Sequence, residues 1–109
     1  MTYEKFKTCI EACYRCASAC DNCAVSCLHE DDVKMMSKCI ELDMHCAEVC
    51  RTAAHLMAKS ERYAKQIAVF CAQVCRDCVA ECSKHQFDHC RKCAEACRLC
   101  AEECEKIAA

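Results

Sequence analysis

The chain has 109 residues, a formal net charge of −2 and 18 cysteines, and it contains no glycine, proline or tryptophan. This length suits one domain, which we take to span residues 1–109. Basic and acidic residues are interspersed along the whole chain, so no basic stripe is available to bind nucleic acid. The longest uncharged run, residues 66–75, is too short to cross a bilayer, and the first residues lack the apolar segment of a secretory signal. We therefore expect a cytoplasmic protein without nucleic-acid or membrane partners.

The cysteines of residues 9–27 recur alternately four and three positions apart, which is the period of an α-helix. Without glycine and proline the chain lacks the usual residues of tight turns, so long helices are favoured over hairpins. The spacing predicts a first helix over about residues 3–28. Its inward stripe consists of Cys9, Cys13, Cys16, Cys20, Cys23 and Cys27.

Three further helices follow from the same pattern. The sequence HEDD at 29–32 predicts a break, with Asp31 or Asp32 as the N-cap of a second helix that ends near Ser60. Ser60 is then the candidate cap of the third helix, and residues 85–88 link to the fourth. The inward stripes of these three helices comprise Met36, Cys39, Asp43, Cys46 and Cys50; Cys71, Cys75, Cys78, Cys82 and His85; and Cys90, Cys93, Cys97, Cys100 and Cys104. The predicted fold class is all-α, a single antiparallel up-down-up-down four-helix bundle with a Cys-lined core.

Uses of cysteine that need no metal are disfavoured. Cytosolic cysteines are kept reduced, so a disulfide framework is not expected. Alanine, valine or leucine would fill a core without the oxidation hazard of 18 thiols, which argues against cysteine as simple core filler. CxxC pairs such as Cys13 and Cys16 lie in mid-helix and lack the βαβ setting of a thioredoxin-type motif. Metal binding is the class that the pattern favours.

Every cysteine except Cys39 and Cys90 belongs to a CxxxC pair, and this spacing indicates which metal ion the cysteines bind. Residues four apart on a helix have Cβ atoms about 5–6 Å apart, so two thiolates can close on one metal ion from opposite sides. That two-coordinate arrangement suits Cu(I). Charge favours Cu(I) too, because Zn²⁺ with four thiolates leaves two negative charges in a buried core, whereas Cu(I) with bridging thiolates approaches neutrality. We predict multiple Cu(I) ions, up to about one per cysteine, with all 18 cysteines as ligands.

Other functions remain open at this stage. A zinc or cadmium buffer of metallothionein type predicts about one metal per three or four cysteines. An iron–sulfur or thiol redox protein predicts a visible chromophore or a reversible disulfide. A scaffold whose thiols are incidental predicts that Cys→Ala changes leave the metal tolerance of the cell untouched.

The chain resembles the bacterial copper-storage proteins, specifically their cytosolic branch, over essentially its whole length. The resemblance lies in the CxxxC series, in CIELDMHCAEVC (39–50) and in KHQFDHCRKCAEAC (84–97). It implies a four-helix bundle that sequesters Cu(I) in quantity and assembles as a homotetramer. We accordingly expect a non-enzymatic copper store, with a copper chaperone as an open donor or acceptor. Apolar positions that could serve contacts between subunits, or equally the seams within one bundle, are Ile10, Leu28, Val49, Val69 and Val74.

Antiparallel packing is expected to gather soft and borderline ligands at one end of the bundle, the His/Met end. This end collects Cys27, His29, Met35, Met36, Cys82, His85, His89 and Cys90. The opposite, apolar end collects Phe6, Met57, Ala64, Ile67 and Ile107. We predict that Cu(I) enters and leaves at the His/Met end, because thioethers and imidazoles bind it more weakly than thiolates do and can pass it inward.

Individual side chains of the His/Met end carry separate predictions. His85, His89 and Met36 are candidate additional ligands. Asp43 occupies a stripe position where a cysteine is expected, and it is predicted to hydrogen-bond across the core or to donate an oxygen to copper. Histidines expected to project off the stripe are His29, His45 and His55.

Overall fold

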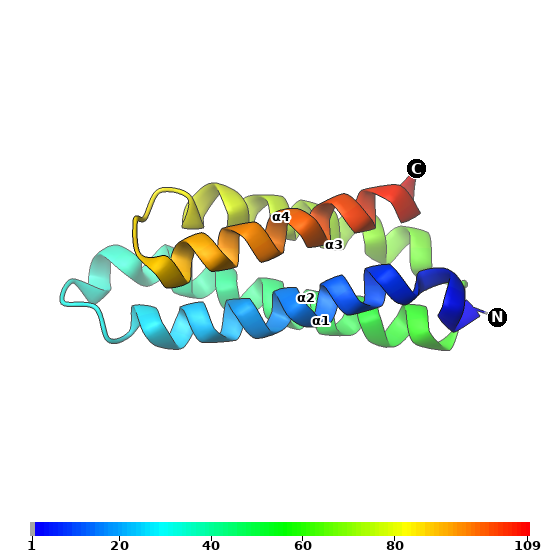
Figure 1. The fold of residues 1–109 in the computed structure, drawn as a ribbon, viewed down its shortest axis with the longest axis horizontal. Coiled ribbons are helices and arrows are strands. Elements are labelled where there is room, and N and C mark those ends of the chain that lie inside the picture. Colours follow the sequence, from blue (N-terminus) through cyan, green and yellow to red (C-terminus); the bar gives the residue numbers. More distant parts are fainter. Residues whose placement is uncertain (1) are drawn as a thin grey trace.

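The computed structural model describes residues 2–109, which form four long helices and one short 3₁₀ segment. In chain order the segments are α1 (Thr2–Cys27), η1 (Val33–Met36), α2 (Ser37–Lys59), α3 (Ala64–Cys82) and α4 (Asp88–Ala108). Successive helices run in opposite directions along a rod of 48 × 20 × 17 Å, and the start of α1 lies at the same end as the finish of α4 (Figure 1). The prediction of an all-α, antiparallel four-helix bundle is confirmed.

The turns between the helices contain the residues expected to act as caps. Asp32 Oδ1 accepts a hydrogen bond from the Met35 backbone N–H at 3.2 Å and so caps η1, which runs directly into α2. Ser60 does not cap α3, contrary to the prediction. Its Oγ instead accepts a hydrogen bond from the Arg62 backbone N–H at 3.3 Å, in the turn that precedes α3. The intervening turn residues place Ser60 too far from the first free N–H groups of the helix.

One core lies between the four helices. Helix α1 packs against α2 and α4, and α3 packs against the same two helices. All 18 cysteines are buried in this core. Alanines such as Ala17, Ala47 and Ala101 are buried beside them, and their small side chains allow the helices to approach closely. Sulfur and methyl groups therefore take the place of the larger aliphatic side chains that usually fill a helical bundle.

The two ends of the bundle differ as predicted. Phe6, Met57 and Ala64 are buried at the apolar end, where Ile67 and Ile107 pack partly buried against the core. The α1–α2 turn and the α3–α4 turn lie together at the opposite end (Figure 1). The core is therefore closed by apolar side chains at one end and by two polar turns at the other.

The outer surface is mixed. Ile10 is buried, so it is not available for contacts between subunits, and Val49 and Val74 pack partly buried against the core. Leu28 and Val69 remain 54% and 53% exposed. Within residues 2–109, none of the helices combines the length and the apolar character needed to cross a membrane.

Candidate metal-binding core

The cysteine sulfurs form a continuous column along the bundle axis. Neighbouring Sγ atoms lie 3.4–4.0 Å apart, and Cys16 and Cys97 form the closest pair at 3.4 Å. Most of these close pairs join different helices, as Cys16 and Cys97 do, whereas Cys23 and Cys27, at 3.9 Å, lie on one helix. Because a disulfide bond is only about 2.05 Å long, every thiol of the column is free.

The column contains several groups of four thiols, some of which overlap. In each group the sulfurs lie within 4.8 Å of one another. Five of the groups are Cys13, Cys71, Cys100 and Cys104; Cys16, Cys46, Cys50 and Cys75; Cys16, Cys20, Cys46 and Cys97; Cys20, Cys78, Cys93 and Cys97; and Cys23, Cys27, Cys39 and Cys90. Cys16, Cys20, Cys46 and Cys97 each belong to two of these five. The groups cannot all hold metal at once unless such thiolates bridge two ions.

The spacing of the sulfurs matches what a thiolate-bound metal needs. Metal–sulfur bonds of about 2.3 Å place trigonal or tetrahedral ligands roughly 3.8–4.0 Å apart. The observed separations of 3.4–4.0 Å lie at or just below this range. Small outward movements of the side chains are therefore enough to admit metal ions.

Burial shifts the acidity of the thiols at the His/Met end. Burial, assisted by the charge of Cys39, raises the pKa of Cys90 to about 11. Burial also raises the pKa of Cys27. A buried thiolate is costly without a cation beside it. A metal ion that binds these two residues must therefore displace their protons.

Asp43 lies within the sulfur column and is fully buried. Its Oδ1 accepts hydrogen bonds from the thiols of Cys78 and Cys93 at 3.3 Å each, and from Cys82 at 3.6 Å. Burial, followed by the charge of Cys93, raises the pKa of Asp43 to about 8. The predicted hydrogen bonding across the core is confirmed, because this one side chain links α2 to both α3 and α4. Donation of an oxygen to copper stays a prediction.

Among the histidines of residues 2–109, His89 alone has a ring nitrogen within hydrogen-bonding range of thiols. Its Nδ1 lies 3.5 Å from the Sγ of Cys90, 3.6 Å from that of Cys23 and 3.8 Å from that of Cys27. These three cysteines belong to one thiol group, which lies at the end of the bundle with the two polar turns because α1 ends at Cys27 and α4 begins at Asp88. The imidazole is therefore placed where a metal ion arriving from this end would meet the first thiols.

Two other side chains fix the His89 ring. Its Nε2 lies 2.8 Å from Glu30 Oε2. Phe87 stacks on the ring, with centroids 5.4 Å apart and planes inclined by 6°. The His89 side chain is only 15% exposed. The ring is thus held on one face and at both nitrogens.

His85 lies at the same end but points elsewhere. Its Nε2 lies 3.1 Å from Glu81 Oε2, and among residues 2–109 no thiol lies within hydrogen-bonding range of its ring. Glu81 is 6% exposed and also accepts a hydrogen bond from Lys84 Nζ at 3.3 Å. Burial opposes ionisation of Glu81, but the hydrogen bonds from His85 and Lys84 outweigh it and lower the pKa of this carboxyl. Metal binding by His85 stays a prediction and requires its side chain to turn inward.

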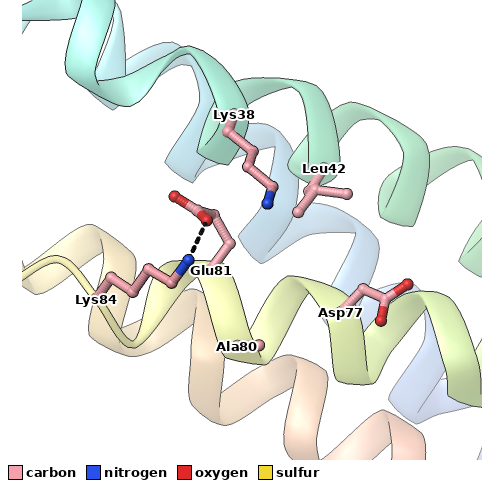
Figure 2. A pocket seen from close by; sticks show the side chains of 6 residues that line it. All are labelled: Lys38, Leu42, Asp77, Ala80, Glu81 and Lys84. Atoms are coloured by element: carbon pink, nitrogen blue, oxygen red, sulfur yellow. Dashed lines mark hydrogen bonds and ion pairs between the residues drawn. The ribbon is translucent and has the colours of Figure 1, made fainter.

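Glu81 also lines a groove of about 270 Å³ between α2 and α3 (Figure 2). The lining residues are Lys38, Leu42, Asp77, Ala80, Glu81 and Lys84. This lining carries amines and carboxylates but no sulfur or imidazole. The groove therefore offers no soft ligand and lies outside the thiol column.

The remaining soft and borderline ligands divide by exposure. Met36 is fully buried at the His/Met end, whereas its neighbour Met35 is 56% exposed. Ligation by Met36 stays a prediction. The three histidines expected to project off the stripe are exposed, namely His29, His45 and His55.

Three residues that shape the His/Met end are not among those predicted from the sequence. Glu30 and Phe87 both lie in turns, where helix periodicity gives no signal, and only the tertiary structure brings them to His89. Glu81 could have been found, because it lies one helical turn before His85 at a spacing that pairs a carboxylate with an imidazole.

The family described as "Copper storage protein" matches residues 2–109 of this chain. The chain belongs to the copper storage protein family. Its relatives include the cysteine-rich protein YhjQ of Bacillus subtilis, which is 44% identical over 88 residues, covering 81% of this chain and 82% of that protein.

Solved structures of this family share the fold. A cytosolic copper storage protein from Streptomyces lividans, solved with five coppers, is 41% identical with a TM-score of 0.93, and the match covers 98% of this chain and 94% of that chain. The Cu(I)-bound copper storage protein BsCsp3 is 43% identical with a TM-score of 0.91, covering 95% of this chain and 98% of that chain. The Streptomyces protein Ccsp has also been solved with ten copper equivalents. Members of the family with this fold thus bind several copper ions.

Proposed function

We propose that this protein is a non-enzymatic store that binds many Cu(I) ions through its 18 cysteine thiolates. The observation that supports this proposal most directly is that adjacent groups of four share thiols, as at Cys16 and Cys46. Shared thiolates bridge two ions each, which brings a full core towards about one metal per thiolate. Only a monovalent ion leaves such a core close to neutral, and a buried core does not tolerate a large uncompensated charge.

A zinc buffer accounts less well for the same geometry. Four of the five groups share no cysteine with one another, so four Zn²⁺ ions could fill separate sites, but each four-thiolate zinc site would retain two negative charges. Such sites would leave uncompensated negative charge along the whole buried column, which a protein core does not tolerate. The copper-loaded relatives support the Cu(I) assignment.

Copper exchange is proposed to take place at the His/Met end. The apolar end is closed by the buried side chains of Phe6 and Met57. At the opposite end His89 Nδ1 faces the outermost thiols, and an imidazole binds Cu(I) reversibly enough to pass it to Cys90 and its neighbours. Each thiol that binds copper releases its proton. Met36, His85 and Asp43 are proposed as secondary ligands along this route.

The assembly and the setting of the protein are proposed by likeness to the family. We propose a single domain over residues 1–109, a cytoplasmic location as for the Streptomyces relative, and a homotetramer. Exposed apolar side chains such as Leu28, Val69 and Phe70 provide surface for contacts between subunits. A copper chaperone is the proposed donor or acceptor of the stored metal.

The test is a Cu(I) titration of the fully reduced protein under nitrogen, with bathocuproine disulfonate as the competing chromophoric chelator. We expect retention of well over about ten copper ions per chain. Saturation at about four or five ions, the number expected for separate tetrathiolate sites, would contradict storage through bridging thiolates. A parallel titration with Zn²⁺ serves as the control and should saturate at that lower number.

A further inference from the structure

Two carboxylate–histidine pairs lie at the His/Met end, and they differ in what the second ring nitrogen faces. In the pair formed by Glu81 and His85, no thiol of residues 2–109 lies within hydrogen-bonding range of the imidazole. In the pair formed by Glu30 and His89, the second nitrogen faces three thiols. Only the second pair therefore connects a carboxylate through an imidazole to the sulfur column.

The contact with Glu30 determines which nitrogen of His89 carries the proton. A carboxylate oxygen can only accept hydrogen bonds, so Nε2 of His89 must be the donor across the 2.8 Å contact. In the neutral imidazole Nδ1 then bears a lone pair. That lone pair points at the thiols of Cys90 and Cys23, 3.5 and 3.6 Å away. A soft cation bound to Nδ1 would thus be within reach of the first thiolates.

The contact between Glu30 and His89 joins residues far apart in the sequence, and neighbouring groups hold it in place. Glu30 follows α1 and His89 lies in the first turn of α4, 59 positions later, so the pair joins the two polar turns. The Glu30 side chain is 26% exposed, which leaves its carboxylate partly shielded from water. Phe87 covers one face of the ring and opposes its rotation. The thiols at Nδ1 can either donate or accept a hydrogen bond, so the Glu30 carboxylate is the contact of His89 that has a fixed direction.

We propose that Glu30 is a positioning residue for copper uptake, which holds His89 as its Nε2–H tautomer with the Nδ1 lone pair directed at Cys23, Cys27 and Cys90. A carboxylate behind a histidine also makes the imidazole a better donor to a metal. This inference rests on the proposed storage of Cu(I), but the tautomer of His89 can be measured without any copper.

The first experiment is long-range ¹H–¹⁵N correlation NMR of the reduced, metal-free protein at a pH where His89 is neutral. We expect the Nε2–H pattern for His89 in the wild type and a mixture of tautomers in Glu30→Leu. Glu81→Leu is the matched control, because it removes the carboxylate behind the other histidine and should alter only the His85 signals. An Nδ1–H pattern in the wild type, or an unchanged tautomer in Glu30→Leu, would overturn the proposal.

The second experiment follows the transfer of the first equivalents of Cu(I) from its bathocuproine disulfonate complex by stopped flow. Glu30→Leu should slow this transfer roughly tenfold, the loss typical of removing the partner of a ligand histidine. The double variant Glu30→Leu/His89→Ala should be no slower than His89→Ala alone, since Glu30 acts through His89. Independent losses that multiply in the double variant would overturn the proposal.

Two checks keep these results interpretable. Thermal unfolding monitors the fold of each variant, and Glu30→Ala replaces Glu30→Leu if the bulkier side chain destabilises the turn. The final copper capacity of Glu30→Leu should equal that of the wild type. A wild type that fails to retain copper would contradict the storage function, whereas an unaltered His89 tautomer in the variant would contradict only the role of Glu30.

Discussion

Asp43 Oδ1 lies 3.3 Å from the Sγ of Cys93 and accepts its hydrogen bond, which joins α2 to α4 inside the sulfur column. Asp43 is fully buried, and a buried carboxylate is costly unless it is protonated or paired with a cation. In the metal-free protein its partners are thiols instead of cations. Its pKa of about 8 therefore keeps this carboxyl largely protonated at neutral pH.

The raised pKa of Asp43 predicts that the metal-free protein loses stability as the pH rises. The pKa of this carboxyl is 3.8 in the unfolded chain and about 8 in the folded protein. Its contribution to the stability of the folded protein is therefore complete below pH 3.8 and is lost as the pH rises to about 8. Between these two pH values the free energy of unfolding falls by at most about 1.4 kcal/mol per pH unit. An asparagine at this position cannot ionise, so Asp43→Asn should remove this slope. Urea unfolding of both reduced proteins at pH 5 and pH 8 measures it, and equal slopes would contradict the assignment.

Removal of a shared thiol should lower copper capacity more than removal of a terminal one. Cys46 belongs to two groups of four, and its Sγ lies 3.7–3.9 Å from four other sulfurs. Cys9 lies at the end of the column, 3.7 Å from Cys104. We expect Cys46→Ala to lose more than one copper ion and Cys9→Ala to lose about one at most. The endpoint of the competitive Cu(I) titration measures both, and equal losses would argue against bridging at Cys46.

The apolar end should contribute stability without contributing copper sites. Met57 is fully buried there, so Met57→Ala should lower the free energy of unfolding by about 2–5 kcal/mol through lost burial and the cavity left behind. Met44 on the same helix is 62% exposed, and Met44→Ala is the matched control with an expected change within about 0.5 kcal/mol. Urea unfolding of the metal-free proteins measures the difference. Copper capacity should be unchanged in both variants.

Copper loading should stabilise the bundle, and copper removal should reverse the effect. The thiol groups are assembled only when the four helices are packed, so copper that bridges them binds the folded state in preference to the unfolded chain. Circular dichroism melts of the reduced protein should show a Tm that rises with copper content. Extraction with excess bathocuproine disulfonate should restore the metal-free Tm. A Tm independent of copper content would place the metal outside the packed core.

The fold and the sulfur column could be predicted from sequence because both depend on local periodicity. Cysteines three and four apart must lie on one face of a helix, and a chain without glycine or proline has few alternatives to long helices. The same pattern placed Asp43 in the buried stripe and Met57 at the closed end, and both are fully buried. Ser60 escaped this logic, since the length of a turn is not encoded in the helix period.

The sequence alone thus determined which residues face the core, because the side-chain direction on a helix follows from its position in the repeat. The tertiary structure decided which thiols are shared between groups, since this depends on the relative height of four packed helices. It also decided that His89 faces the thiols while His85 turns to Glu81. His85 and His89 are four residues apart, but His85 lies in the connection before α4 and His89 lies within α4. The directions of their side chains therefore depend on the path of that connection. Glu30 reaches His89 only because antiparallel packing brings two distant turns to the same end of the bundle.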